Sequence, residues 1–504
     1  MKHCSQLLTG FCFVCILFAT GCAHKKQAGL WNQFRGPNAS GIAEDSTPPL
    51  DLSQPKWSVE IPLGNSSPVV WKHKVFITAF IDKSLATLCY SRKSGELLWQ
   101  KTISVEEFEN LHDTNTPASS TPYVDEDGLY AYFGSYGLIC YDHDGNQQWA
   151  LEIPTPKNIY GMSTSPIIYQ DKMILILDNS EQFEDSKSKK SKVIALDKTN
   201  GETIWEAARP QIGEGWSSPM IWSHDDGDEL IIQGSGRLTA YDPKDGSERW
   251  WVNGMPPHTV HTPIAGEKYL YAGSAQLGGL ANEKFDPEEM WKATLQFDAN
   301  ENNQIDEDEM KHEHFTLPFR PELPIDHPGF GFPTQFRDGI INSLDANKDK
   351  IIVKEELVKM YGFGGGSKPV IMAIQPGASG EADETHVTWS VNRNIPEIPS
   401  PLYYQGRIYM IRDGGIFACI NAESGDLLYR GRINSMGQFS ASPIAANGHV
   451  YVASTYGVIT IMAAGDELKV VKQFDLGEEI HSTPAIVGNE FVVRTNERLY
   501  LFES

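Results

Sequence analysis

The stretch "VIALDKTNGETIW" at residues 193–205 joins two short apolar runs through a polar turn. Gly201 closes the turn, where the chain needs a positive φ that glycine adopts freely. Trp205 ends the second run. The same pattern, always ending in an aromatic residue, recurs at residues 87–99, 138–149, 238–250 and 417–429. A hairpin repeated in this way predicts an all-β protein built from similar units.

A second marker, a Ser or Thr followed by Pro, sets the length of the unit. Six of the seven intervals between successive copies span 41–54 residues, and the fifth interval spans 138. The eight copies begin at Ser67, Thr121, Ser165, Ser218, Thr262, Ser400, Ser442 and Thr483. A period of about 40–50 residues with about four strands per unit is typical of a β-propeller blade. We therefore predict an eight-bladed β-propeller in which the marker opens the inner strand of each blade.

The two ends of the chain are predicted to close the ring together. The eighth unit ends at "RLYLFES", one strand short, whereas "KWSVEIPL" at residues 56–63 has no partner nearby in the sequence. An open sheet edge invites unwanted pairing, so strand 56–63 is expected to complete the last blade. The repeated tryptophans and the scattered residues Cys89, Cys140 and Cys419 are expected to pack inside and between blades.

The 138-residue interval contains two twelve-residue loops, "DANENNQIDEDE" at 298–309 and "DANKDKIIVKEE" at 345–356. Both resemble the EF-hand calcium loop, which supplies oxygen ligands from positions one, three, five, seven, nine and twelve. The first loop offers the side chains of Asp298, Asn300, Asn302, Asp306 and Glu309 and the backbone carbonyl of Gln304. The second offers the side chains of Asp345, Asn347, Asp349 and Glu356 and the backbone carbonyl of Ile351, with a water in place of Val353.

Three further features favour a small α-helical EF-hand pair inserted in the fifth blade, with calcium as its cofactor. Ile305 and Ile352 both stand at position eight, where paired loops join through a short β-bridge. Position six, normally Gly, holds Asn303 and Lys350, and the second site is expected to be the weaker one because Lys tolerates left-handed geometry less well. Residues 283–365 carry 18 Asp and Glu against 9 Lys and Arg, a net charge of −9 that bound calcium would relieve.

The N-terminus indicates export from the cytoplasm. Lys2 precedes a short apolar run that is too short for a membrane span and ends in "ATGC". This ending resembles the lipobox of bacterial lipoproteins, which implies lipidation of Cys22. The predicted organisation is a lipoprotein signal peptide at 1–21, a tether at 22–55, a propeller at 56–282 and 366–504, and the EF-hand pair at 283–365.

The hairpin ending in Trp resembles the repeat of the PQQ-like β-propeller family, which includes pyrroloquinoline-quinone (PQQ) dehydrogenases and the outer-membrane assembly lipoprotein BamB. The quinoprotein alcohol dehydrogenases hold PQQ against two adjacent, disulfide-linked cysteines, and no two cysteines of this chain are adjacent. No catalytic residue is therefore predicted, and PQQ is not expected. His258, His261 and His481 lie near blade starts without converging partners, so they are expected to be ordinary loop histidines.

The sequence favours a lipid-anchored, calcium-binding scaffold that binds envelope proteins and faces the periplasm from the outer membrane, with a role in outer-membrane protein assembly. A quinone-dependent oxidoreductase and an envelope polysaccharide-binding protein remain the alternatives. The formal net charge of −24 disfavours nucleic acid as a partner, because an acidic chain repels phosphate backbones.

Overall fold

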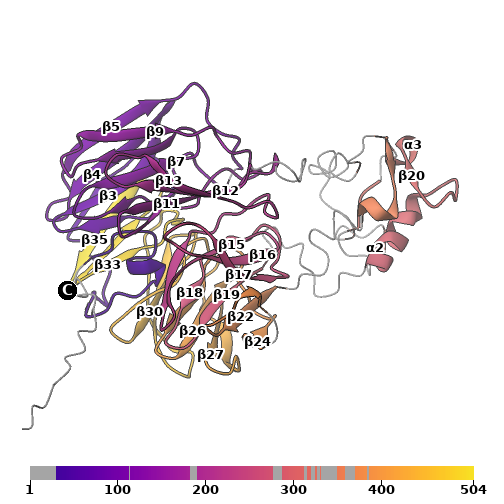
Figure 1. Ribbon diagram of the computed structural model, residues 1–504. Helices are drawn as coiled ribbons and strands as arrows, with labels where there is room; N and C mark the ends of the chain where they lie inside the picture. Colours follow the sequence, from indigo (N-terminus) through magenta and orange to yellow (C-terminus); the bar gives the residue numbers. More distant parts are fainter. Residues whose placement is uncertain are drawn as a thin grey trace, which may run out of the picture.

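A computed structural model describes residues 30–112, 114–181, 190–275, 287–311, 315–318, 324–325, 330, 345, 349–357, 369–382 and 385–504 (Figure 1). Cys22, Asn347 and the predicted signal peptide lie outside these residues. Eight of the sheets contain four or five strands, and a ninth has two. No described helix has the length and apolar character needed to cross a membrane.

Each blade is an antiparallel meander, and blade four gains one parallel strand at its outer edge. Blades one and two consist of β2 (Val69–Trp71), β3 (Lys74–Ile81), β4 (Ser84–Ser91), β5 (Leu97–Ser104), β6 (Tyr123–Val124), β7 (Leu129–Phe133), β8 (Gly137–Tyr141) and β9 (Gln147–Glu152). Blades three and four consist of β10 (Ile167–Tyr169), β11 (Lys172–Leu177), β12 (Lys192–Asp197), β13 (Thr203–Ala208), β14 (Met220–His224), β15 (Gly227–Gly234), β16 (Arg237–Tyr241), β17 (Glu248–Asn253) and the added β23 (Gly380–Glu381).

The remaining blades follow the same plan. Blades five and six consist of β18 (Ile264–Ala265), β19 (Leu270–Ser274), β22 (Val370–Ile374), β24 (Val387–Val391), β25 (Leu402–Tyr404), β26 (Arg407–Arg412), β27 (Ile416–Asn421) and β28 (Leu427–Arg432). Blades seven and eight consist of β29 (Ile444–Ala446), β30 (His449–Ala453), β31 (Val458–Ala463), β32 (Val470–Asp475), β33 (Ala485–Val487), β34 (Glu490–Arg494), β35 (Arg498–Glu503) and β1 (Trp57–Glu60).

The predicted ring closure is confirmed. β1 pairs antiparallel with β35, and Trp57 stands opposite Leu501 in the register. The strand at the start of the propeller therefore supplies the outer strand of blade eight. Because β1 covers the edge of β35, the C-terminal strand is not left open for pairing with another chain.

The Ser/Thr-Pro marker forms a closed ring of hydrogen bonds around the propeller axis. In each blade the backbone N–H of the marker residue donates to the marker hydroxyl of the next blade, at 2.9–3.3 Å. The last bond, from Thr483 N to Ser67 Oγ at 3.0 Å, joins blade eight to blade one. The bond from Thr262 N to Ser400 Oγ bridges the long interval in the sequence. All eight marker residues are buried, so every bond satisfies an N–H that has no water to donate to.

Tryptophans and glycine turns join neighbouring blades farther from the axis. The Trp99 ring lies so close to Gly145 of the next blade that a Cβ there would come within 2.8 Å of it. Trp99 Nε1 also donates to His143 O in that turn, at 3.0 Å. Trp149 makes the equivalent contacts with Gly201 and with Lys198 O. The predicted packing role of these tryptophans is confirmed, and Cys89, Cys140 and Cys419 are likewise buried and free of disulfides.

Residues 30–52 cross one face of the propeller. The segment bonds to Val70 in blade one through Trp31, to Ile221 in blade four through Asn38, and to Gly488 in blade eight through Thr47. Since these blades lie on different sides of the ring, the segment spans the axis. The predicted tether at 22–55 is therefore wrong over this part, because contacts such as those of the fully buried Trp31 hold the segment in the fold.

A second residue of this segment reaches the ring itself. The buried Arg35 guanidinium donates through Nη2 to Pro401 O, 2.7 Å away, directly after the marker residue Ser400. Burial lowers the pKa of Arg35 to about 9. The indigo segment in Figure 1 lies against the blades, and its short 3-10 helix η1 (Pro37–Ala39) contacts the inner strand β14 of blade four.

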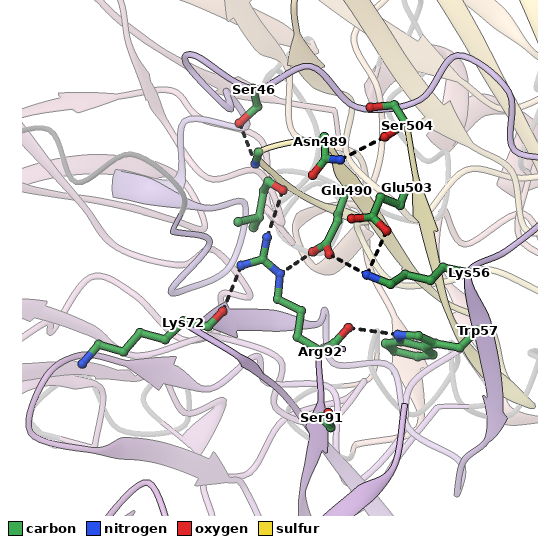
Figure 2. Close-up of polar contacts among 12 residues, drawn as sticks. Ser46, Lys56, Trp57, Lys72, Ser91, Arg92, Asn489, Glu490, Glu503 and Ser504 are labelled. Carbon is green, nitrogen blue, oxygen red and sulfur yellow. Dashed lines mark hydrogen bonds and ion pairs between the residues drawn. The ribbon is translucent and has the colours of Figure 1, made fainter. Parts of the chain in front are cut away.

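The seam between blades eight and one carries a cluster of charged side chains (Figure 2). Arg92 Nε donates to Glu490 Oε2, and Arg92 Nη2 donates to Val487 O at 3.2 Å. Lys56 Nζ lies 3.5 Å from Glu490 Oε1 and 2.9 Å from Glu503 Oε2. Glu490 is only 6% exposed, so it is the buried acceptor on which both cations converge.

We predict that Glu490→Ala lowers the free energy of unfolding by about 3 kcal/mol, because it removes the buried carboxylate that pairs with Arg92 and leaves Lys56 to pair with Glu503. The matched control is Glu503→Ala, whose carboxylate is more exposed and whose loss is expected to cost under about 1 kcal/mol. Urea unfolding followed by tryptophan fluorescence measures both. Equal losses in the two variants would show that the seam does not depend on Glu490.

The segment between β19 and β22 forms a small separate unit. These strands are neighbours in blade five, although residues 275–369 lie between them in the chain. The unit contains α2 (Pro287–Thr294), η2 (Leu295–Phe297), β20 (Ile305–Asp306), α3 (Glu307–Met310) and β21 (Ile351–Ile352). It has its own core, in which Met290, Trp291, Met310 and Leu357 are buried. In Figure 1 this unit stands to one side of the blades.

Candidate functional site

The two predicted loops meet through the two-stranded sheet. β20 pairs antiparallel with β21, and Ile305 stands directly opposite Ile352, as predicted. Both residues are fully buried in the core of the unit. Lys350 in the second loop also forms an ion pair with Glu307, the tenth residue of the first loop, at 3.0 Å. The two-stranded sheet therefore joins the two loops directly before their ninth positions.

The first loop winds its backbone around its own oxygen atoms. Asp298 Oδ1 accepts from Asn302 N at 3.1 Å, and Asp298 Oδ2 accepts from Asn303 N at 2.8 Å. The side-chain oxygens of Asn300 and Asn302 accept from backbone N–H groups two residues ahead, at 3.0 and 2.9 Å. Asn303 has φ 65°, the left-handed geometry expected at position six. Positions one, three and five thus turn their oxygens toward the inside of the loop.

Glu309 closes the first loop from its far end. Its Oε1 accepts from Ala299 N at 2.7 Å, and its Oε2 accepts from Asp306 N at 3.0 Å. Asp306 Oδ1 in turn caps the first turn of α3, which completes a capping box with Glu309. The other oxygen of Asp306 accepts from Asn300 Nδ2 at 3.0 Å. The side chains of positions three, nine and twelve consequently converge on one end of the loop.

The second loop repeats part of this arrangement. Asp345 Oδ2 accepts from Lys350 N at 3.0 Å, which matches the bond from position six to position one in the first loop. Lys350 also has φ 65°. Asp349 Oδ1 accepts from Ile351 N, and Glu356 Oε2 accepts from Val353 N. Asp345 Oδ1 is buried without a hydrogen bond, so it is an acceptor with no donor among the described residues.

The donor chemistry of the first loop suits a hard cation such as calcium, which binds carboxylate, amide and carbonyl oxygens. Among the described residues, however, no three His, Cys, Asp or Glu side chains are grouped closely enough to hold a metal ion. The loop accounts for part of this, because two of its candidate ligands are Asn side chains and one is a backbone carbonyl. Its carboxylates instead accept backbone N–H groups in the structure.

A second group of residues, of which the sequence singled out only His258, lies in the links that precede the inner strands. Rings from four successive links pack together, with centroids 5.0 Å apart for His112–Tyr160, 5.2 Å for Tyr160–Trp216 and 5.8 Å for Trp216–His258. Glu214 is buried beside His258, with 3.5 Å between its Oε2 and His258 Nε2. Burial raises the pKa of Glu214 to about 7 and lowers the pKa of His258.

Glu109 is the second carboxyl in these links with a strongly shifted pKa. Its Oε2 accepts from Met162 N at 2.8 Å, whereas its Oε1 is buried without a hydrogen bond. Burial raises its pKa from 4.5 to about 7. Each link differs in length and composition from the others, so no repeated sequence pattern could have pointed to Glu109 or Glu214.

The other two loop histidines show how the links differ. His261 is buried and its Nδ1 lies 2.9 Å from Gly273 O, and burial lowers its pKa to about 4. His481 is more exposed and lies 3.3 Å from Glu479. Neither joins a group of metal-binding side chains among the described residues.

The family model described as outer membrane protein assembly factor BamB matches residues 51–213, 189–296 and 338–499. The chain belongs to this family. The fold of BamB from Moraxella catarrhalis is similar, with 12% identity, a TM-score of 0.51, and coverage of 90% of this chain and 97% of that one. A europium-containing methanol dehydrogenase is also similar, with 11% identity, a TM-score of 0.54, and coverage of 95% and 99%. At such identities these likenesses show the fold alone, and no curated protein sequence matches the chain.

The match to the BamB family covers the second loop but not the first. Residues 297–337, which include the first loop at 298–309, fall outside the matched segments, whereas the second loop falls inside the last one. Membership of the BamB family therefore says nothing about the first loop. The assignment of that loop rests on its own residues and on its pairing with the second loop.

We predict that stability falls as pH rises from 5 to 8. A carboxyl whose pKa rises from 4.5 unfolded to about 7 folded binds its proton more tightly in the folded state, so its contribution is present below pH 4.5 and lost through pH 7. For Glu109 the shift corresponds to about 3 kcal/mol at most. Glu109→Gln should therefore raise the melting temperature at pH 8 and change it little at pH 5. The exposed neighbour Glu107→Gln is the control, and an equal gain in both variants would contradict the prediction.

Proposed function

We propose that the protein is a lipid-anchored, non-enzymatic scaffold of the bacterial cell envelope, which binds envelope proteins through its propeller and calcium through an EF-hand pair. Membership of the BamB family supports the scaffold role and a place on the periplasmic side of the outer membrane. The observation that carries the calcium role is the direct pairing of the position-eight residues, Ile305 and Ile352. Two loops with chance spacing would have no reason to meet in this register.

In this proposal the metal has a structural role. Calcium supplies a compact double positive charge, which offsets the surplus of carboxylates in residues 283–365. Asp298, Asn300, Asn302, Asp306, Glu309 and the carbonyl of Gln304 would hold it in the first loop. Asp345, Asn347, Asp349, Glu356 and the carbonyl of Ile351 would hold it in the second. Ordering the loops fixes how α2 and α3 stand beside blade five.

Calorimetric titration of the full chain with calcium tests this role. We expect dissociation constants of about 10⁻⁴–10⁻³ M, the range of extracellular modules, with the first loop binding more tightly. Glu309→Gln should remove most of the heat of the first site, and Glu356→Gln that of the second. Glu301→Gln and Glu355→Gln are matched controls, because both carboxylates stand in the same loops at positions that bind no metal. The absence of any heat at millimolar calcium would refute the site.

Anchoring is tested at Cys22. If this residue carries the lipid, Cys22→Ala should move the protein from the membrane fraction to the soluble fraction or leave its signal peptide uncleaved. Cys140→Ala is the control, because Cys140 is buried in blade two and is expected to leave fractionation unchanged. Wild-type protein that lacks acyl chains in mass spectrometry would rule out the anchor.

Two measurements separate a scaffold from an enzyme. Cross-linking in solubilised envelopes, followed by affinity purification, should recover outer-membrane assembly proteins with the chain. Addition of PQQ and calcium should produce neither quinone absorbance bound to the protein nor dye-linked oxidation of alcohols or sugars. Stoichiometric quinone binding with turnover would replace the scaffold by a quinone-dependent oxidoreductase.

A further inference from the structure

A groove of about 1140 Å³ lies on the face of the propeller that the N-terminal segment crosses. One wall is residues 37–47 of that segment, and the other is the turns between the first and second strands of blades five, six and seven. Because the Ser/Thr-Pro marker stands at the opposite end of each inner strand, this face is the reverse of the one that carries the links. The groove is large enough for a ligand of several rings.

The charge of the lining restricts the ligand. Among the described residues that line the groove there is no Lys, Arg or His, whereas Glu44, Asp45 and Glu267 are present. Phosphate, sulfate and acidic polymers would find no cation among these described lining residues and would meet the carboxyl groups of Asp45 and Glu267. These carboxylates are also not grouped for a metal, since the described residues hold no such cluster. The lining therefore favours a neutral or cationic ligand that forms hydrogen bonds.

The lining combines amide side chains with tyrosine rings. Gln405 and Asn447 are exposed, and their side-chain amides make no hydrogen bond within the described residues, so each offers both a donor and an acceptor. Tyr404 is held in place because its hydroxyl accepts from Gly448 N at 2.9 Å. Tyr403 stacks on Tyr271, with ring centroids 5.6 Å apart, and lines the groove with its remaining surface.

This combination fits a sugar better than a peptide. Sugar rings present hydroxyls at their edges for amides and carboxylates, and C–H faces for tyrosine rings. A peptide added as a strand needs an open sheet edge, but the groove is lined by tight turns such as Gly266 to Tyr269, whose backbone bond is already made at 2.8 Å. We infer that the groove binds an oligosaccharide without negative charge, at a site independent of the proposed calcium loops.

Calorimetric titration of the full chain with three hexasaccharides tests this inference. The probes are an N-acetylglucosamine hexamer, its deacetylated cationic form, and an acidic galacturonic acid hexamer. We expect the first two to bind, the cationic form more tightly because of the carboxylates of Asp45 and Glu267, and the acidic one not to bind. Absence of heat with both of the first two, or equal binding of the acidic hexamer, would overturn the inference.

A double variant that does not strain the backbone tests whether the sugar binds in the groove. Gln405 and Asn447 have φ 51° and 45°, so Gly at both positions removes the amides without a conformational penalty. The double variant Gln405→Gly, Asn447→Gly should bind at least tenfold more weakly with an unchanged melting curve. Gln170→Gly is the matched control. Gln170 has φ 57° in the equivalent turn of blade three, between β10 and β11, and does not line the groove. Equal binding by the double variant, or tighter binding of hexalysine than of the sugars, would contradict a saccharide site here.

Discussion

The ring of eight hydrogen bonds between Ser/Thr-Pro markers is the constraint on which the rest of the structure depends. Each bond uses a backbone N–H of one blade and a hydroxyl of the next, so every blade is both donor and acceptor. Buried N–H groups that lose their acceptor cost about 1–3 kcal/mol each. A ring of this kind closes only when every blade is present, and β1 then covers the outer edge that blade eight would otherwise expose. The 95 residues between β19 and β22 can be accommodated because they leave the blade between its second and third strands and so do not interrupt the marker residue or the inner strand.

Repetition decided what could be predicted from the sequence. The markers, the glycine turns and the aromatic ends recur, and they gave the number of blades, the position of the insert and the closing strand. Residues 30–52 and β23 could not be predicted, because their contacts occur once. Trp31 and Arg35 have no counterpart in other blades, and nothing in the sequence shows that they fill the axis. Glu109 and Glu214 were missed for the same reason, since their shifted pKa values come from burial by neighbouring links.

The place of the insert and the pairing of its two loops could be predicted because the loop pattern has a fixed spacing, whereas the EF-hand assignment and calcium binding stay predictions. Ile305 and Ile352 meet as the position-eight rule requires, and Asn303 and Lys350 adopt the left-handed geometry of position six. The structure adds that Glu309 accepts backbone N–H groups at both ends of its loop. The same carboxylate would have to exchange these bonds for calcium, so metal binding and the order of the loop are coupled. The propeller has a separate core and does not share this dependence.

We propose a rigid ring and an insert that calcium would order, and hydrogen exchange with and without calcium tests this proposal most directly. Mass spectrometry of the full chain reports backbone N–H groups in both parts at once. The account predicts that peptides covering 295–311 and 349–357 become protected at millimolar calcium, while peptides with the marker residues keep the same strong protection throughout. Unchanged exchange in the insert, or a calcium effect spread evenly over the blades, would contradict it.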